Sequence, residues 1–365
     1  MVYYCEKCNK FWNHEVKTCI FCGSETQKSD ESEYKVLSST LVHVPSKDNE
    51  NVPYFVYLLE DKNGHKIIRK SDSQYQIGEQ VNLNKTESAK ILVGIVGTGL
   101  MGAQIAEFLI QKGYSVILKT RSEKGIESTY IKIQKKLSKK LEEQEVQQCL
   151  NNLSLTTDYS DLKNVDLIIE ASKEDLEIKK EIFSILSNIC KSETTFATNS
   201  SSLSTDALAE VTDRPDRFIG LHFFNPVQKM DLIEVVLGEK TSEKTKLFAV
   251  DFAKDLKKQP IIVKNSPGFI VNRLLLPQIN EAARLLGEGI ASKEDIDAAV
   301  KLGLNHPMGP FELADFIGLD TCLLILNVLH NDLGNEHFEP APLLKEMVSQ
   351  GKLGFKSGEG FYKYN

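Results

Sequence analysis

The chain has 365 residues, of which 41% are hydrophobic and 26% are charged. This composition is that of an ordinary globular protein, and it excludes a disordered or collagen-like chain. The formal net charge is −7, which argues against a nucleic-acid-binding protein that relies on an excess of positive charge. No stretch approaches the roughly 18 uninterrupted apolar residues of a membrane helix, so we expect no membrane span.

The seven cysteines are distributed unevenly, and four of them form two Cys-x-x-Cys pairs: Cys5, Cys8, Cys19 and Cys22. An odd total, together with an N-terminus that lacks the apolar segment of a secretory signal, favours a cytoplasmic protein with reduced thiols. Each pair can direct two sulfurs at one ion, and four thiolates complete a closed tetrahedral site. We therefore predict structural zinc, with iron in a rubredoxin-like site as the alternative.

The distribution of cysteines, turn residues and hydrophobic residues divides the chain into four predicted segments. Residues 1–30 hold the cysteine pairs and are too short to bury a core of their own. Residues 31–88 contain short strand-like runs between turn residues, which is typical of a small OB-like β-barrel. Residues 90–266 alternate strand-like and helical patterns, which predicts an α/β fold with a Rossmann-type doubly wound sheet. Residues 267–365 lose the strands, so we expect an all-α C-terminal domain.

The predicted elements of the last two segments alternate until residue 266. The pattern begins with a strand over 91–96, a helix over 103–112, a strand over 115–119 and an amphipathic helix over 125–141. Further strands are predicted over 166–171, 195–201, 218–224, 232–238 and 260–264. The apolar spacing after residue 267 then predicts helices over 269–289, 292–304 and 311–333.

A glycine-rich loop lies between the first predicted strand and the first predicted helix: Gly97-Thr98-Gly99-Leu100-Met101-Gly102. Gly97 permits a tight turn, Gly99 lets the backbone approach a pyrophosphate, and Gly102 allows close helix packing. The N–H groups that begin the helix can then bind the phosphates. This context predicts a dinucleotide site that includes the whole loop.

The end of the second strand bears on the choice between NAD and NADP. An NAD site usually carries Asp or Glu there, which binds the ribose 2′-hydroxyl. This chain has Lys119-Thr120-Arg121 instead, and two cations around a hydroxyl suit a 2′-phosphate better than a bare ribose. We therefore expect Thr120 and Arg121 to contact the cofactor and NADP to be preferred, with NAD as the alternative.

Polar residues interrupt apolar surroundings in three segments, 199–203, 222–226 and 265–273. His222 ends a predicted strand, which is where doubly wound sheets place their ligands. Glu234 lies in the next strand, which can return alongside and bring its carboxylate to the imidazole. A lone histidine is usually a buried structural residue, but a His–Glu pair at this position is a candidate general acid–base.

Residues 90–365 resemble the L-3-hydroxyacyl-CoA dehydrogenase family, which includes the 3-hydroxybutyryl-CoA dehydrogenases. The resemblance rests on GTGLMG, NSSSL, GLHFFNPV, SPGFIVNRLL, HPMGPFELADFIGLD and GEGFYKY, in the order of the family. It implies hydride transfer between NAD(P) and a (3S)-3-hydroxyacyl-CoA of short chain length, with 3-oxoacyl-CoA as the oxidised form. It also implies a homodimer formed through the apolar C-terminal helices.

The same resemblance implies roles for individual residues. His222 is the expected acid–base, Glu234 its orienting carboxylate, and Ser201 and Asn272 are the polar groups at the substrate. Expected contacts near the nicotinamide are Glu174, Lys179, Asn225 and Lys356, and expected contacts with coenzyme A are Thr129, Lys136 and Ser201. The family pattern has serine where Thr129 stands and Asp where Thr120 stands. Lys136 belongs to a lysine stripe that is either a solvated surface or a contact for CoA phosphates: Lys132, Lys135, Lys136, Lys139 and Lys140.

Residues 1–88 resemble the small proteins, with a rubredoxin-like zinc ribbon and an OB-like barrel, that accompany acyl-CoA enzymes such as thiolases. The motifs are VPYFVYLLED and QIGEQV, and they imply docking to a thiolase or handling of acyl-CoA. With 11 basic and 13 acidic residues, this region is not expected to bind nucleic acid. Two alternatives stay open for the whole chain: an inactive scaffold that recruits a thiolase, and a dehydrogenase of a free hydroxy acid.

Overall fold

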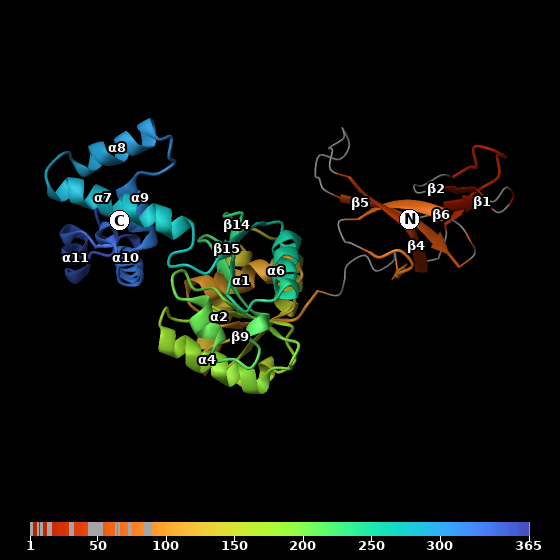
Figure 1. Ribbon diagram of the computed structural model, residues 1–365, viewed down its shortest axis with the longest axis horizontal. Helices are drawn as coiled ribbons and strands as arrows, with labels where there is room; N and C mark the ends of the chain where they lie inside the picture. Colours follow the sequence, from red (N-terminus) through yellow and green to blue (C-terminus); the bar gives the residue numbers. More distant parts are fainter. Residues whose placement is uncertain are drawn as a thin grey trace. The chain divides into compact units, whose positions relative to one another are not determined.

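The computed structural model describes residues 3–5, 7, 10–12, 17–28, 33–42, 54–62, 64, 66–71, 75–82 and 90–364. The chain forms two compact units, Met1–Ala89 and Lys90–Asn365, which Figure 1 draws in red to orange and in orange to blue. The second unit carries all of the residues with predicted catalytic and dinucleotide-binding roles.

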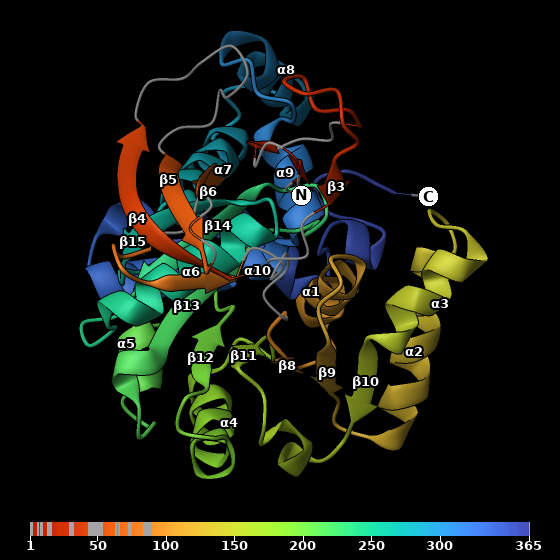
Figure 2. The ribbon, with the colours of Figure 1, turned by 90° about the vertical axis from the view of Figure 1, so that its right-hand side faces the viewer.

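An eight-stranded sheet forms the centre of the second unit, with the order β10-β9-β8-β11-β12-β13-β14-β15. The strands from β10 to β13 in this order are parallel, β14 is antiparallel to β13, and β15 is parallel to β14. In Figure 2 the strands from β13 to β10 lie side by side, with α2 and α3 beside the β10 edge. The bounds are β8 (Val93–Val96), β9 (Val116–Lys119), β10 (Leu153–Thr156), β11 (Leu167–Glu170), β12 (Thr195–Thr198), β13 (Phe218–Phe223), β14 (Leu232–Leu237) and β15 (Gln259–Lys264).

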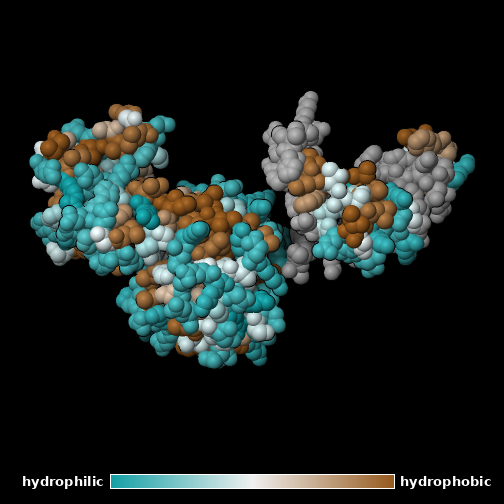
Figure 3. All heavy atoms as spheres, viewed as in Figure 1, coloured by the Kyte–Doolittle hydropathy of each residue, from teal (hydrophilic) through white to brown (hydrophobic). Residues whose placement is uncertain are grey.

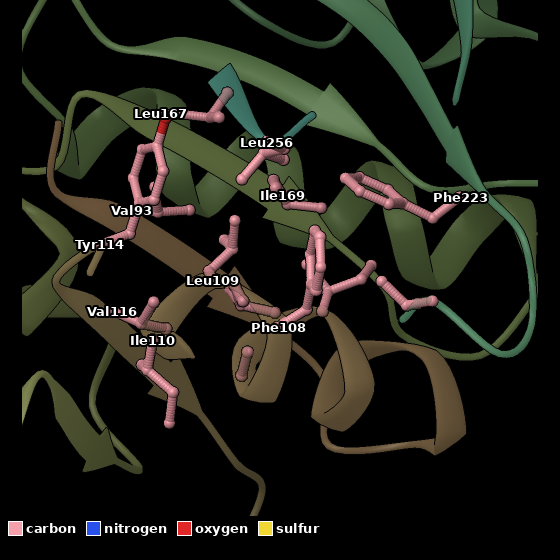
Figure 4. Packing of buried hydrophobic residues seen from close by; sticks show 14 of the residues in the cluster. Val93, Phe108, Leu109, Ile110, Tyr114, Val116, Leu167, Ile169, Phe223 and Leu256 are labelled. Carbon is pink, nitrogen blue, oxygen red and sulfur yellow. The ribbon is translucent and has the colours of Figure 1, made fainter. Parts of the chain in front are cut away.

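Helices cover both faces of this sheet, which explains why its central strands are apolar along their whole length. Leu167 and Ile169 of β11 face one core together with Leu109 of α1 (Figure 4). Phe252 of α6 belongs to the same core. Ile168, between them, belongs to the core on the opposite face. The helices are α1 (Leu100–Gln111), α2 (Glu123–Leu137), α3 (Glu143–Asn151), α4 (Leu176–Ile189), α5 (Thr205–Ala209) and α6 (Glu243–Asp255), with 3-10 turns η1 (Tyr159–Leu162) and η2 (Pro215–Arg217).

The remainder of the second unit is helical, as predicted, and has a separate hydrophobic core. Its elements are α7 (Val271–Gly287), α8 (Lys293–Gly303), α9 (Pro310–Ile317), α10 (Leu319–Leu333), η3 (Glu336–Phe338), α11 (Pro342–Ser349) and η4 (Phe355–Ser357). Within the described parts of the chain, no single helix is long and apolar enough to cross a membrane, and one bent pair, α9 with α10, meets the length and composition criteria when taken together.

The structure corrects two predicted helices. The predicted helix 311–333 is two helices, α9 and α10, which meet at 96°; Gly318 lies between them with a φ of 103°, a conformation that side chains disfavour. The predicted helix 125–141 ends early, because α2 stops at Leu137. A turn follows, which brings Leu141 against the same core that α2 covers.

The described part of the first unit contains two small sheets. β1 (Tyr3–Cys5), β2 (Lys10–Trp12) and β3 (Gln27–Lys28) form one, in the order β2-β1-β3. β4 (Glu33–Val42), β5 (Tyr54–Asp61), β6 (Lys66–Ser71) and β7 (Gln80–Asn82) form an antiparallel sheet in the order β6-β5-β4-β7. The predicted β-rich region is therefore present. Among the described strands, β6 and β7 are the two edges of this sheet, so a closed barrel stays a prediction. The zinc ribbon also stays a prediction.

Candidate active site

His222 and Glu234 face each other across the antiparallel pair β13 and β14, where they are in direct register. The Nδ1 atom of His222 lies 2.7 Å from Oε2 of Glu234. The imidazole is 6% exposed and the carboxylate residue 1%, and the rings of Phe224 and Phe269 lie against the imidazole. The predicted pair therefore exists, in surroundings that exclude most water.

The second oxygen of Glu234, Oε1, accepts hydrogen bonds of 3.0 Å from the backbone N–H groups of Ile270 and Val271. These groups begin α7, so one carboxylate joins the sheet to the helical domain. Burial alone would raise the pKa of Glu234, but the His222 bond and charge, together with the two backbone donors, outweigh it and hold that pKa below its ordinary value. Glu234 therefore stays ionised.

An ionised Glu234 determines what His222 can do. A carboxylate only accepts hydrogen bonds, so the proton of a neutral imidazole is held on Nδ1 and the Nε2 atom is left as a base. When Nε2 takes a proton, the adjacent carboxylate stabilises the resulting positive charge. This is the arrangement of a general acid–base that an orienting carboxylate supports.

Ser201 lies in the loop after β12, which Glu174 organises. The Oε1 atom of Glu174 accepts hydrogen bonds from Ser200 Oγ, from the backbone N–H groups of Ser201 and Ser202, and from Ser202 Oγ. Asn272, in the first turn of α7, donates from Nδ2 to the Ser201 carbonyl at 3.2 Å. The structure thus brings together three predicted residues, Ser201, Asn272 and Glu174.

Lys179 lies beneath this loop and is 1% exposed. Its ammonium group is 2.9 and 2.8 Å from the two carboxylate oxygens of Glu170 and 3.4 Å from Oε2 of Glu174. Glu170, which is 0% exposed, also accepts from Ser172 and Thr198. Burial raises the pKa of Glu174, but the Lys179 charge and the serine-loop donors outweigh that effect and lower it.

Glu170 was not among the sequence-predicted site residues, although it connects several of them. It lies at the end of β11, in the position where parallel strands place ligands, and that position is the signal that identifies it. Its carboxylate holds Lys179, and Lys179 holds Glu174. The structure therefore gives Lys179 two carboxylate partners inside the protein, where the sequence resemblance implied a contact with the nicotinamide.

The glycine loop has the predicted strand–turn–helix geometry between β8 and α1. Gly97 has a φ of 113°, and a Cβ atom there would lie 2.5 Å from the Ala171 carbonyl oxygen. A Cβ atom on Gly102 would lie 2.0 Å from the Gly97 carbonyl oxygen. Only glycine fits these two positions. Gly99 caps α1, and Leu100 and Met101 begin it, so the loop leads directly into a helix N-terminus that can bind phosphate.

Of the residues at the end of β9, Arg121 is exposed, while Lys119 and Thr120 are buried. Lys119 is 8% exposed, with its Nζ atom 4.0 Å from the ring centroid of Tyr159; burial and the Arg121 charge lower its pKa. The Thr120 hydroxyl interacts with the backbone of Ser122. Of the two cations proposed to face a phosphate, Arg121 is therefore the exposed one.

A pocket of about 320 Å³ lies between α1, the end of α2, the β13–β14 loop and α9. Three lysines of the predicted stripe line it, Lys136, Lys139 and Lys140, and Asn225 forms part of its wall. Thr129 is buried within α2 and is not among the lining residues. Lys356 forms an ion pair with Asp320 of α10, within the helical domain. The structure therefore brings Lys136 and Asn225 to one pocket, but not Thr129.

Three of the four predicted metal ligands cluster in the first unit. The ligand atoms of Cys5, Cys19 and Cys22 lie within 4.8 Å of one another, and the Cys5 and Cys22 sulfurs are 3.4 Å apart. Tetrahedral zinc with bonds of about 2.3 Å places its sulfurs about 3.8 Å apart, so the group fits. Hydrogen bonds from Ser24 lower the pKa of the Cys22 thiol to about 6. Cys8 lies outside the described residues.

Two family models match the second unit: the NAD-binding domain of 3-hydroxyacyl-CoA dehydrogenase over residues 92–266, and its C-terminal domain over residues 268–364. The chain belongs to the 3-hydroxyacyl-CoA dehydrogenase family. This confirms the resemblance of the second unit, the Rossmann-type sheet with its helical domain, and the presence of an NAD-binding domain. The first unit lies outside both models.

Individual members of the 3-hydroxyacyl-CoA dehydrogenase family are closely similar to this chain. A 3-hydroxybutyryl-CoA dehydrogenase from Clostridioides difficile is 46% identical over 75% of this chain and 99% of the relative. A mitochondrial hydroxyacyl-coenzyme A dehydrogenase from Sus scrofa is 46% identical over 74% of this chain and 90% of the relative. The solved (S)-3-hydroxybutyryl-CoA dehydrogenase from Ralstonia eutropha is 44% identical, covers 76% of this chain and all of its own, and has a TM-score of 0.70.

Proposed function

We propose that this protein is an NAD(P)-dependent dehydrogenase that interconverts (3S)-3-hydroxyacyl-CoA and 3-oxoacyl-CoA, with short acyl chains such as 3-hydroxybutyryl. The observation that carries this proposal is the buried His222–Glu234 pair beside Ser201 and Asn272, within a dinucleotide fold of this family. The pocket lined by Lys136, Lys139 and Lys140 supports a coenzyme A substrate, because ammonium groups pair well with its phosphates.

Four side chains carry out the reaction. A bound nicotinamide supplies the hydride acceptor for C3. His222 Nε2 accepts the proton of the 3-hydroxyl group, and Glu234 stabilises the imidazolium through Nδ1. Ser201 and Asn272 supply hydrogen-bond donors for the oxygen that becomes a carbonyl, and the same groups stabilise its negative charge in the reverse direction. In that direction His222 returns the proton to the 3-oxygen.

The decisive experiment offers the purified protein acetoacetyl-CoA or free acetoacetate, with NADH or NADPH, and follows the absorbance of the reduced cofactor. We expect oxidation of the cofactor with the thioester and little with the free acid. Activity with the free acid alone would identify a hydroxy-acid dehydrogenase instead. An absence of turnover with every combination would favour the scaffold alternative.

Cofactor preference is the first testable detail. NADPH is the proposed preferred cofactor, because Arg121 is exposed at the end of β9 and no acid stands there. Arg121→Ala should lower kcat/KM for NADPH about tenfold, the effect of losing one charged hydrogen bond, and leave kcat/KM for NADH within about twofold. Lys124→Ala, which removes an exposed cation three residues further on, is the matched control. A wild-type enzyme that strongly prefers NADH would contradict the proposal.

Zinc in the first unit is the second testable detail. We infer one structural zinc ion on Cys5, Cys8, Cys19 and Cys22, since three of these sulfurs already form a cluster that fits it. Elemental analysis should find about one zinc per chain. Cys19→Ser should reduce this below half an equivalent, whereas Cys149→Ser, a substitution on α3, should not. Retention of full zinc in Cys19→Ser would exclude this ligand set, and iron in place of zinc would indicate the rubredoxin-like alternative.

Two assemblies complete the proposal. The helical domain exposes large apolar side chains on and beside α7 and α8: Leu274, Ile290, Leu302 and Leu304. Figure 3 shows hydrophobic surface over this domain. Surfaces of this kind favour a subunit interface, so a homodimer is proposed, and the mass in solution tests it.

The resemblance of the first unit supports docking to a thiolase or another acyl-CoA enzyme.

A further inference from the structure

Gln104 is a buried polar side chain to which the mechanism above assigns no role. It lies on α1, two residues after the last glycine of the dinucleotide loop, and is 5% exposed. Its Oε1 atom accepts a hydrogen bond of 2.9 Å from the backbone N–H of Val227. Its Nε2 atom donates one of 2.9 Å to Oδ1 of Asn225. Both ends of the Gln104 amide therefore bind the loop that follows β13.

The chemistry of these partners determines the orientation of both amides. The backbone N–H of Val227 can only donate, so it must face the oxygen of Gln104. The NH₂ group of Gln104 then faces Asn225, which must offer its oxygen. The NH₂ group of Asn225 is consequently the end that points away from Gln104. The backbone N–H of Val227 thus determines the orientation of the Gln104 amide, and the Gln104 amide determines that Asn225 directs its NH₂ group away from Gln104.

The position of Asn225 in the chain and in the pocket links it to the functional site. Asn225 is three residues beyond His222, and with Gln104 it lines the pocket that Lys136, Lys139 and Lys140 also line. We propose that Gln104 is a positioning residue that makes Asn225 present a hydrogen-bond donor to a carbonyl oxygen bound beside His222. Such an oxygen is available in the carboxamide of the cofactor and in the acyl thioester. The inference rests on the proposed function and deepens it.

Two substitutions separate this role from a structural one. Gln104→Leu removes both hydrogen bonds and leaves Asn225 free to turn either way. Gln104→Glu keeps an acceptor for Val227 but places a second carboxylate oxygen against Asn225. Asn225 must then turn its NH₂ group inward and present its oxygen to the ligand. A positioning role therefore makes Gln104→Glu the more damaging change, whereas a structural role makes Gln104→Leu the more damaging one.

The measurements are kcat and KM with acetoacetyl-CoA and each reduced cofactor, and the dissociation constant of NADH from its fluorescence. We expect Gln104→Leu to lower kcat/KM a few-fold and Gln104→Glu to lower it about tenfold further, as expected for one inverted hydrogen bond. A loss confined to NADH affinity and cofactor KM would assign the oxygen to the carboxamide. A loss confined to kcat or the KM of acetoacetyl-CoA would assign it to the thioester.

Asn225→Ala provides the control, because it removes the group through which Gln104 acts. In that background, both Gln104 substitutions should change kcat/KM by less than about twofold. A penalty for Gln104→Glu that persists there would be an effect of the added charge and would overturn the inference, as would a larger loss in Gln104→Leu. If Gln104→Leu fails to fold, the comparison of Gln104→Glu, Asn225→Ala and the double variant is sufficient to test the inference. A wild-type protein without turnover would refute the proposed function. The NADH affinities of the wild type, Gln104→Leu and Gln104→Glu would then test the positioning role of Gln104, which predicts the weakest binding in Gln104→Glu.

Discussion

His222→Gln is expected to lower kcat with acetoacetyl-CoA by about 10²–10⁴-fold, which is the usual contribution of a general acid–base. Glutamine can occupy the space of the imidazole, but it neither takes nor returns a proton at the 3-oxygen. The dinucleotide loop and the end of β9 are unchanged by the substitution, so the dissociation constant of NADH should stay within about twofold. Steady-state kinetics and cofactor fluorescence measure the two quantities.

Glu234→Gln should produce a loss of kcat that is similar in order of magnitude. The backbone N–H groups of Ile270 and Val271 would hold the oxygen of the new amide, so its NH₂ group would face Nδ1 of His222. An NH₂ group can neither retain the proton on Nδ1 nor stabilise the imidazolium, and substitution of an orienting carboxylate costs about 10⁴-fold in a well-studied catalytic triad. His337→Gln, an exposed histidine in η3 of the helical domain, is the matched control and should leave kcat unchanged. Near-normal turnover in either active-site variant would remove that residue from the mechanism.

The His222–Glu234 pair was predictable because both of its determinants are local. Each residue lies in a short apolar strand, the two strands follow each other in the chain, and an antiparallel return brings residues of equal distance from the turn face to face. The structure places them in direct register. The glycine loop was predictable for the same reason, since strand, turn and helix are consecutive.

Three features that sequence analysis missed depend on contacts between separate segments or on a single backbone angle. Glu170 gains its importance from Lys179 on α4 and Thr198 on β12, 9 and 28 residues away. Gln104 binds residues more than 120 positions further along the chain. The division between α9 and α10 depends on a positive φ at Gly318, and hydrophobic periodicity alone does not report a backbone angle.

Substitution of Lys179, which is buried between Glu170 and Glu174, is the second change with a large expected effect. Lys179→Met should lower the free energy of unfolding of the second unit by about 3–5 kcal/mol, because it leaves the carboxylate of Glu170 buried without its cation. Lys180→Met is the matched control on the same helix. Lys180 forms a surface pair with Glu177 at 3.4 Å, and such pairs contribute about 0–1 kcal/mol. Denaturant unfolding measures both.

A second substitution distinguishes an unpaired charge from a general packing defect. Glu170→Gln combined with Lys179→Met removes the buried carboxylate charge as well, so the double variant should recover much of the stability that Lys179→Met loses. If Lys179 instead served chiefly as a cofactor contact, its substitution would raise the KM for the dinucleotide while the free energy of unfolding matched that of Lys180→Met. A raised KM with no loss of stability would contradict the structural role of Lys179. In that role, Glu170 holds Lys179, and Lys179 in turn holds Glu174 and the loop after β12.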